Sequence, residues 1–233
     1  MAVSLRGVVA VLLPGTGSDD DYLRRAFGGP LAEAGALMCA VAPDPRDVIG
    51  GYLRALDDAA RRGPIAVGGV SLGAAVAVNW ALGNPGHTVA VLAALPAWSG
   101  PADDAPAAVS ARHTADLLRR DGLDATTAVM RASSPAWLAD ELARSWRRQW
   151  PALPDAMQEA AGYRAPTSAA LRRLVPPMGV AGAPDDLIHP LRVALEWAAA
   201  APHAALREVS LAEFGPHPAR LGAACLRALA AAG

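Results

Sequence analysis

Short runs of apolar residues alternate with longer amphipathic segments along most of the chain. Six runs have the length and composition of buried strands, at residues 8–13, 37–42, 65–70, 89–95, 178–181 and 206–211. The segments between and after them repeat apolar residues at the spacing of one helix face, which predicts helices at 22–34, 45–61, 72–82, 190–200 and 216–230. This alternation predicts an α/β fold, with a mostly parallel sheet of about six strands and helices on both faces.

One segment, from about 101 to 175, interrupts the alternation, because it contains helical patterns and no predicted strand. In residues 135–150 the apolar side chains recur every four positions, and they are Leu138, Leu142, Trp146 and Trp150. The insertion follows the fourth strand, so it would overhang the carboxyl ends of the strands, where sites in open α/β sheets lie. We therefore predict a core of residues 1–100 and 176–233 and a helical cap, or lid, of residues 101–175.

Composition and charge narrow the classes of partner. At 233 residues and 53% hydrophobic, the chain can form one full core and an insertion. The formal net charge of −1 gives no electrostatic footprint for nucleic acid or for an anionic membrane. The 21 basic residues are all arginine and alanine is abundant, which is typical of a GC-rich bacterial genome. The oligomeric state stays open.

The cysteines and the N-terminal apolar run bear on localisation. Cys39 falls in a predicted strand and Cys225 in a predicted helix, so both are expected to be buried thiols in a reducing cytoplasm. Residues 8–13 superficially resemble a signal peptide, but no small-residue cleavage pattern follows and the run is too short to span a bilayer. We therefore predict a cytoplasmic protein.

The strongest chemical signal is Gly69-Val70-Ser71-Leu72-Gly73, directly behind the apolar run that starts at Ile65. A buried strand that turns sharply into a helix, with glycines on both sides of a serine, holds a hydroxyl exposed at the tip of a parallel sheet. The glycines are needed because neighbouring backbones approach closely in such a turn. Ser71 is therefore the predicted nucleophile, at the positive end of the helix that follows.

A serine nucleophile needs a base, and the base needs a carboxylate that orients it. His217 is the predicted base, because it lies in a Gly/Pro-rich loop just past the last predicted strand. His189 is the competing candidate and lies close to the possible acids. With an acid from the segment after the fifth strand, described next, the chain order is serine, acid, histidine. This is the order found in proteins with this kind of turn.

The acid is one of two adjacent aspartates after the fifth strand. The position of the acid can be counted from either end of the segment that follows the fifth strand. Counting forward from Gly182 favours Asp185, and counting back from Pro190 favours Asp186. We predict Asp185 as the acid and Asp186 as a cap of the next helix.

The oxyanion of an acyl-transfer reaction needs two backbone N–H donors. One is expected from Leu72, which follows the nucleophile, and the other from Thr16, in the loop Pro14-Gly15-Thr16-Gly17 after the first strand.

Taken together, the turn at Ser71, the loop at Pro14, the acid turn from Gly182 to Pro190, the late His217 and the helical insertion resemble the α/β-hydrolase family. The resemblance covers nearly the whole chain and implies a core reduced to six strands, because the two N-terminal strands of the family have no counterpart here.

The resemblance implies a serine hydrolase for a carboxylic ester or thioester of an apolar small molecule. The sequence contains no metal cluster, phosphate loop or dinucleotide fingerprint, so we expect no cofactor and no metal. Trp98, Trp137 and Trp146 are the candidate walls of an acyl pocket. The alternatives are a C–C bond hydrolase or lyase on the same scaffold, or a non-catalytic ligand-binding protein.

Overall fold

The computed structural model describes residues 3–232 and contains one six-stranded sheet in which every neighbouring pair of strands is parallel. The strand order is β2-β1-β3-β4-β5-β6. The strands are β1 (Val9–Leu13), β2 (Leu37–Ala40), β3 (Ile65–Val70), β4 (Thr88–Ala94), β5 (Met178–Gly182) and β6 (Ala204–Glu208). The predicted α/β class and six-stranded parallel sheet are confirmed.

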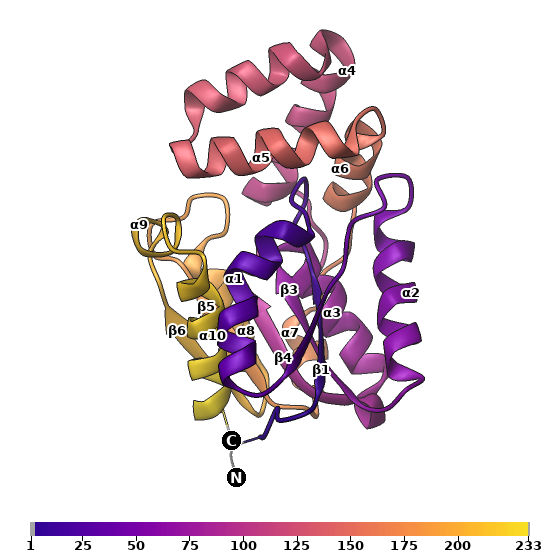
Figure 1. Ribbon diagram of the computed structural model, residues 1–233, viewed down its shortest axis with the longest axis vertical. Coiled ribbons are helices and arrows are strands. Elements are labelled where there is room, and N and C mark those ends of the chain that lie inside the picture. The colour runs from indigo at the N-terminus through magenta and orange to yellow at the C-terminus, as the bar shows by residue number, and fades with distance from the viewer. Residues whose placement is uncertain (1–2, 233) are drawn as a thin grey trace.

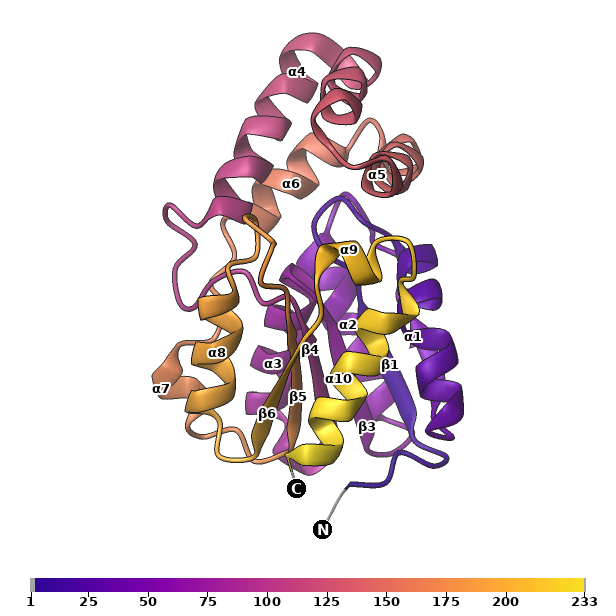
Figure 2. The same cartoon turned by 90° about the vertical axis from the view of Figure 1, so that its left-hand side faces the viewer.

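Helices cover both faces of the sheet, as Figures 1 and 2 show. Helices α1 (Asp20–Glu33) and α10 (Ala219–Ala231) pack into the hydrophobic core on one face, and α2 (Val48–Ala60), α3 (Leu72–Gly83) and α8 (Leu191–Ala200) pack into the core on the other. The strand order reverses between β1 and β3, so their carboxyl ends lie at the switch point where open α/β sheets bind ligands.

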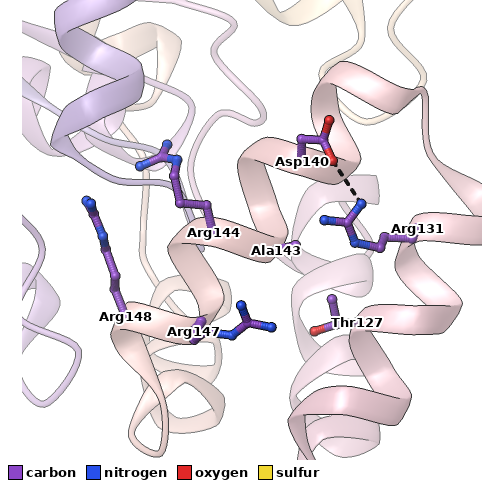
Figure 3. A pocket seen from close by; sticks show the side chains of 7 residues that line it. All are labelled: Thr127, Arg131, Asp140, Ala143, Arg144, Arg147 and Arg148. Atoms are coloured by element: carbon purple, nitrogen blue, oxygen red, sulfur yellow. Dashed lines mark hydrogen bonds and ion pairs between the residues drawn. The ribbon is translucent and has the colours of Figure 1, made fainter.

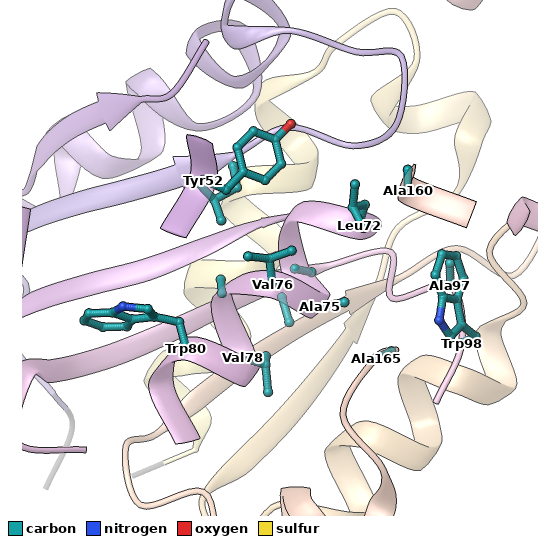
Figure 4. Packing of buried hydrophobic residues seen from close by; sticks show 14 of the residues in the cluster. Tyr52, Leu72, Ala75, Val76, Val78, Trp80, Ala97, Trp98, Ala160 and Ala165 are labelled. Atoms are coloured by element: carbon teal, nitrogen blue, oxygen red, sulfur yellow. The ribbon is translucent and has the colours of Figure 1, made fainter. Parts of the chain in front are cut away.

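Helix α3 begins directly after β3 and is apolar nearly all round, as its sequence predicts. Nine of its twelve residues are buried, because it lies against the sheet on one side and is covered by α2 and the insertion on the other. Figure 4 shows Leu72 and Val76 of this helix packed among aromatic and small side chains. Burial of that extent fixes α3, and with it the residue at its first turn.

The insertion contains α4 (Pro106–Ser133), α5 (Ala136–Gln149), α6 (Leu153–Ala161) and α7 (Ser168–Leu171). Helices α4, α5 and α6 form a layer beyond the carboxyl ends of the strands, whereas α7 lies beside α8 on the core (Figure 2). Helix α4 is interrupted at Gly122, where φ is 80°. Within residues 3–232, no helix is both long and apolar enough to cross a bilayer.

Two local expectations are wrong. Cys39 is exposed, because β2 is an edge strand, and only Cys225 is buried. The last strand ends at Glu208 and not at residue 211, because Ser210 starts the short helix α9 (Leu211–Phe214). The Ser210 hydroxyl accepts from the Glu213 N–H, while the Glu213 carboxylate accepts from the Ser210 N–H, and this capping box stops the strand.

Candidate active site

Ser71 lies at the sharp turn between β3 and α3, in a backbone conformation that residues other than glycine rarely adopt. Its φ is 55° and its ψ is −114°. The flanking glycines make this turn possible, since a Cβ on Gly69 would lie 2.3 Å from the Leu13 carbonyl oxygen and one on Gly73 only 2.0 Å from it. The turn is therefore held by backbone packed directly on backbone, and the serine side chain is left at the edge of the sheet.

A histidine and a carboxylate complete a chain of hydrogen bonds that starts at this serine. Nε2 of His189 lies 3.0 Å from Oγ of Ser71, and Nδ1 of His189 lies 2.7 Å from Oδ2 of Asp186. The exposed side-chain fractions of His189 and Asp186 are 18% and 8%, and Ser71 is 7% exposed. With the proton of the neutral ring on Nδ1, the ring donates to Asp186 and accepts from the Ser71 hydroxyl. This is the arrangement of an activated nucleophile.

The local geometry of the β5–α8 loop explains how acid and base share one segment. Oδ1 of Asp186 accepts the N–H groups of Ile188 and His189, at 2.8 and 3.1 Å, so the chain folds back on the aspartate side chain. This turn directs the imidazole toward the carboxylate three residues earlier. Asp186 therefore fixes both the backbone and the ring of His189.

Ionisation of Asp186 is favoured by the same contacts. Burial opposes the charged form, but the hydrogen bond to the His189 ring, the attraction of that ring and the two backbone N–H groups together hold the pKa of Asp186 below its ordinary value. The Asp186 carboxylate is therefore charged at neutral pH beside the His189 ring.

The structure does not bring the predicted base and acid to Ser71. His217 is exposed in the loop between α9 and α10, because α9 turns the chain away after β6, and the partner of Ser71 Oγ is His189. Asp185 is also exposed, and its carboxylate accepts the N–H of Leu211 at 2.8 Å. The sequence offered His189 and Asp186 as alternatives, and their separation of three residues is the signal that favours them.

The two predicted oxyanion donors lie on either side of the serine. Leu72 is the first residue of α3, so its N–H has no acceptor within the helix. Thr16 lines the cavity described below, and across residues 3–232 its N–H donates no hydrogen bond to protein. Gly15 brings this loop against the turn, since a Cβ there would lie 3.3 Å from the Val70 carbonyl oxygen and 3.4 Å from Cβ of Ser71.

A cavity of about 710 Å³ opens above Ser71, between the carboxyl edge of the sheet and α4 and α5. Its walls are largely apolar, and from α5 they include Trp137, Leu138, Leu142 and Trp146. Arg and Lys side chains are absent from the lining that the described part of the chain provides. The cavity therefore suits an uncharged apolar group next to the serine hydroxyl.

Two of the tryptophans do not lie where the sequence analysis predicts. Trp98 does not line the cavity but packs in the core beside Ala97 and Ala165 (Figure 4), where it is 6% exposed and its Nε1 donates to the Tyr163 carbonyl oxygen. Trp150 follows the last residue of α5 as its C-cap and is 40% exposed. Trp137 and Trp146 do line the cavity, and Trp137 also packs edge-to-face on Phe214, with ring centroids 5.8 Å apart.

Over residues 3–232, the structure has no group of three or more His, Cys, Asp or Glu side chains placed to hold a metal ion. The groups around Ser71 are instead those of acid–base and nucleophilic chemistry.

No protein-family model matches the sequence, and a comparison with curated proteins gives no match. Solved structures match over nearly the whole chain. A hydrolase from Pseudomonas aeruginosa PA01 has a TM-score of 0.68 at 18% identity, covering 96% of this chain and 90% of its own. The enol-lactonase from Burkholderia xenovorans LB400 has a TM-score of 0.68 at 16% identity, with 93% and 86% covered.

A thermophilic esterase from Thermogutta terrifontis has a TM-score of 0.64 at 17% identity, covering 88% of this chain and 82% of its own. At these identities the similarity shows a shared fold, and the chemistry has to be argued from the site itself.

Proposed function

We propose that this chain, which has the α/β-hydrolase fold, is a serine hydrolase that cleaves a carboxylic ester or thioester of a small apolar molecule. The observation that carries the proposal is the continuous contact from Ser71 Oγ through the His189 ring to Asp186, at 3.0 and 2.7 Å. The strained backbone at Ser71 supports it, because such strain persists where it presents a reactive group.

In the proposed reaction, Ser71 Oγ attacks the carbonyl carbon while His189 Nε2 takes the hydroxyl proton. The oxyanion is held by the N–H groups of Thr16 and Leu72, and the ionised Asp186 stabilises the imidazolium. His189 then returns the proton to the departing alcohol or thiol, which leaves an acyl group on Ser71. Attack by water, with the same histidine as base, releases the carboxylic acid and restores the serine.

The substrate class follows from the cavity. Its volume and apolar walls fit an acyl group of medium size, and the described lining contains no Arg or Lys to form an ion pair with a substrate carboxylate. We therefore propose neutral substrates, with Trp137 and Trp146 against the acyl chain. We also propose a cytoplasmic location, since both cysteines are free.

The decisive experiment is labelling with a fluorophosphonate probe and hydrolysis of p-nitrophenyl butyrate by the wild type and by Ser71→Ala. The wild type should be labelled at Ser71 and hydrolyse the ester, and the variant should do neither while keeping its circular dichroism spectrum and melting temperature. A wild type that is folded but neither labelled nor active would refute the proposal and favour a ligand-binding role.

A further inference from the structure

Helix α5 of the insertion rests directly on the loop that carries the Thr16 oxyanion donor. Gln149 Nε2 donates to the Ser18 carbonyl oxygen at 3.1 Å, and Arg144 donates two hydrogen bonds to the Asp19 carboxylate, at 2.7 and 3.1 Å. Trp146 lies against Gly17, since a Cβ on that glycine would be 2.9 Å from the indole Nε1. Three residues of α5 thus contact three consecutive residues of the loop.

The contact of Arg144 with Asp19 is a charged link to a buried carboxylate. Asp19 is 3% exposed, and its carboxylate also accepts the N–H groups of Asp21 and Tyr22 as the N-cap of α1. Glu141, 6% exposed, binds Arg144 and Arg25, so these two partly exposed arginines neutralise the buried carboxylates of Asp19 and Glu141 across the contact. A two-bond guanidinium–carboxylate pair of this kind fixes orientation as well as distance.

The other end of the loop is fixed by the core. The Tyr52 hydroxyl donates to the Pro14 carbonyl oxygen at 3.2 Å, and Gly15 packs on the Ser71 turn. Thr16 and Gly17 lie between these two anchors, and Gly17 has a φ of 71° and no side chain to hold it. The position of the Thr16 N–H therefore depends on an anchor in the core and on an anchor in α5.

The contact between the loop and α5 also buries two polar groups at a cost in free energy. Trp146 Nε1 and Ser18 Oγ are buried without a hydrogen-bond partner within residues 3–232. Burial of polar groups without partners is unfavourable, so the hydrogen bonds of Arg144 and Gln149 have to offset it for α5 to stay on the loop.

From these contacts we infer that Arg144 and Gln149 are positioning residues, which place the Thr16 oxyanion donor by holding the loop against α5. The inference rests on the proposed hydrolase function. It predicts that loss of either contact lowers kcat, because a displaced donor weakens binding of the oxyanion more than binding of the ground-state ester.

Arg147 gives a matched control. It is an exposed arginine on the same helix, and in Figure 3 its side chain extends toward Thr127 of α4, whereas Arg144 and Arg148 extend the other way. Within residues 3–232 it forms no ion pair, while Arg131 in the same surface groove is paired with Asp140 at 2.8 Å.

The experiment compares Arg144→Gln, Gln149→Met, Arg144→Lys and Arg147→Gln by kcat and KM on p-nitrophenyl butyrate, by fluorophosphonate labelling rate and by melting temperature. We expect kcat and the labelling rate to fall roughly 10- to 100-fold in Arg144→Gln and Gln149→Met, with KM changed less than about twofold. Arg144→Lys should recover part of the loss, because lysine keeps the charge but not the two-bond geometry. Arg147→Gln should match the wild type.

A purely structural role for the contact predicts lower melting temperatures with unchanged kcat in the folded protein, and this result would overturn the inference. Gln149→Met removes no charge and loses only the neutral hydrogen bonds to the Ser18 carbonyl oxygen and the Ser145 hydroxyl, so this variant still tests the inference if Arg144→Gln does not fold. An unlabelled, inactive wild type would overturn the proposed function, whereas an active wild type with equally active Arg144→Gln and Gln149→Met would overturn only the positioning role.

Discussion

The sharpest test of the site compares His189→Ala with His217→Ala. In the structure His189 is the only imidazole bonded to Ser71 among the described residues, at 3.0 Å, and its other nitrogen is 2.7 Å from Asp186. Alanine at 189 removes both the proton acceptor of the serine and the group that the carboxylate stabilises. Losses for members of such a unit are on the order of 10⁴- to 10⁶-fold in kcat, or about 5 to 8 kcal/mol of activation free energy.

The two variants should also differ in stability. Without the ring, Asp186 keeps the backbone N–H groups of residues 188 and 189 but loses one charge-assisted hydrogen bond. We expect His189→Ala to lower the free energy of unfolding by about 1.5 to 3 kcal/mol. His217 is exposed, and within residues 3–232 its side chain makes no hydrogen bond, so His217→Ala should change it by less than about 0.5 kcal/mol.

The assay is p-nitrophenyl butyrate hydrolysis by the purified variants, with stability measured by urea unfolding followed by circular dichroism. The control is the double variant Ser71→Ala/His189→Ala, which should be no slower than either single variant, because the groups act as a unit. The reasoning is refuted if His217→Ala loses turnover while His189→Ala keeps it, since the ring that serves Ser71 would then come from the other loop.

Three further predictions concern packing, specificity and pH. Gly73→Ala should be insoluble or lose more than about 4 kcal/mol of stability, because its Cβ would meet the Leu13 backbone, whereas Gly83→Ala, with no atom within 4 Å, should fold normally; equal melting temperatures would contradict this. Trp137→Ala should reduce kcat/KM more for hexanoate than for acetate esters, by up to about fourfold for each methylene that loses its contact, and a chain-length profile of unchanged shape would remove Trp137 from the acyl pocket. Because the folded-state pKa of Asp186 is lowered, its charged form stabilises the fold above about pH 4, and this contribution disappears as the pH falls through the folded-state pKa. The melting-temperature difference between wild type and Asp186→Asn should therefore shrink below about pH 4, and a constant difference from pH 7 to pH 3 would disprove the argument.

Local sequence was enough to predict the sharp turn at Ser71. The spacing of Gly69, Ser71 and Gly73 behind an apolar run requires backbone packed against backbone, and the structure places the Leu13 carbonyl oxygen where side chains on those glycines would be. The all-round apolar composition of 72–82 likewise predicted a helix enclosed on both sides, which α3 is. Both features depend on residues adjacent in the chain, so the sequence contains the information that determines them.

The end of β6 is also determined by a local signal in the sequence. Ser210 and Glu213 have the spacing of a capping box, and this box ends β6 and starts α9. With α9 in place, the segment after it no longer passes the sheet edge as a simple loop, and His217 is exposed.

The partners of Ser71 were decided by the tertiary structure. His189 is 118 positions from the serine in the chain, and no periodicity relates the two residues. The turn of the β5–α8 loop on Asp186 and the capping box of α9 are local, but which histidine reaches Ser71 depends on where the sheet places these loops relative to the end of β3. The exposure of Cys39 has a similar origin, because strand order, and not strand sequence, places β2 at the edge. Hydrophobic patterning thus determined which segments form strands and helices, while the packing of separate strands and loops at the carboxyl edge of the sheet determined which side chains meet at the serine.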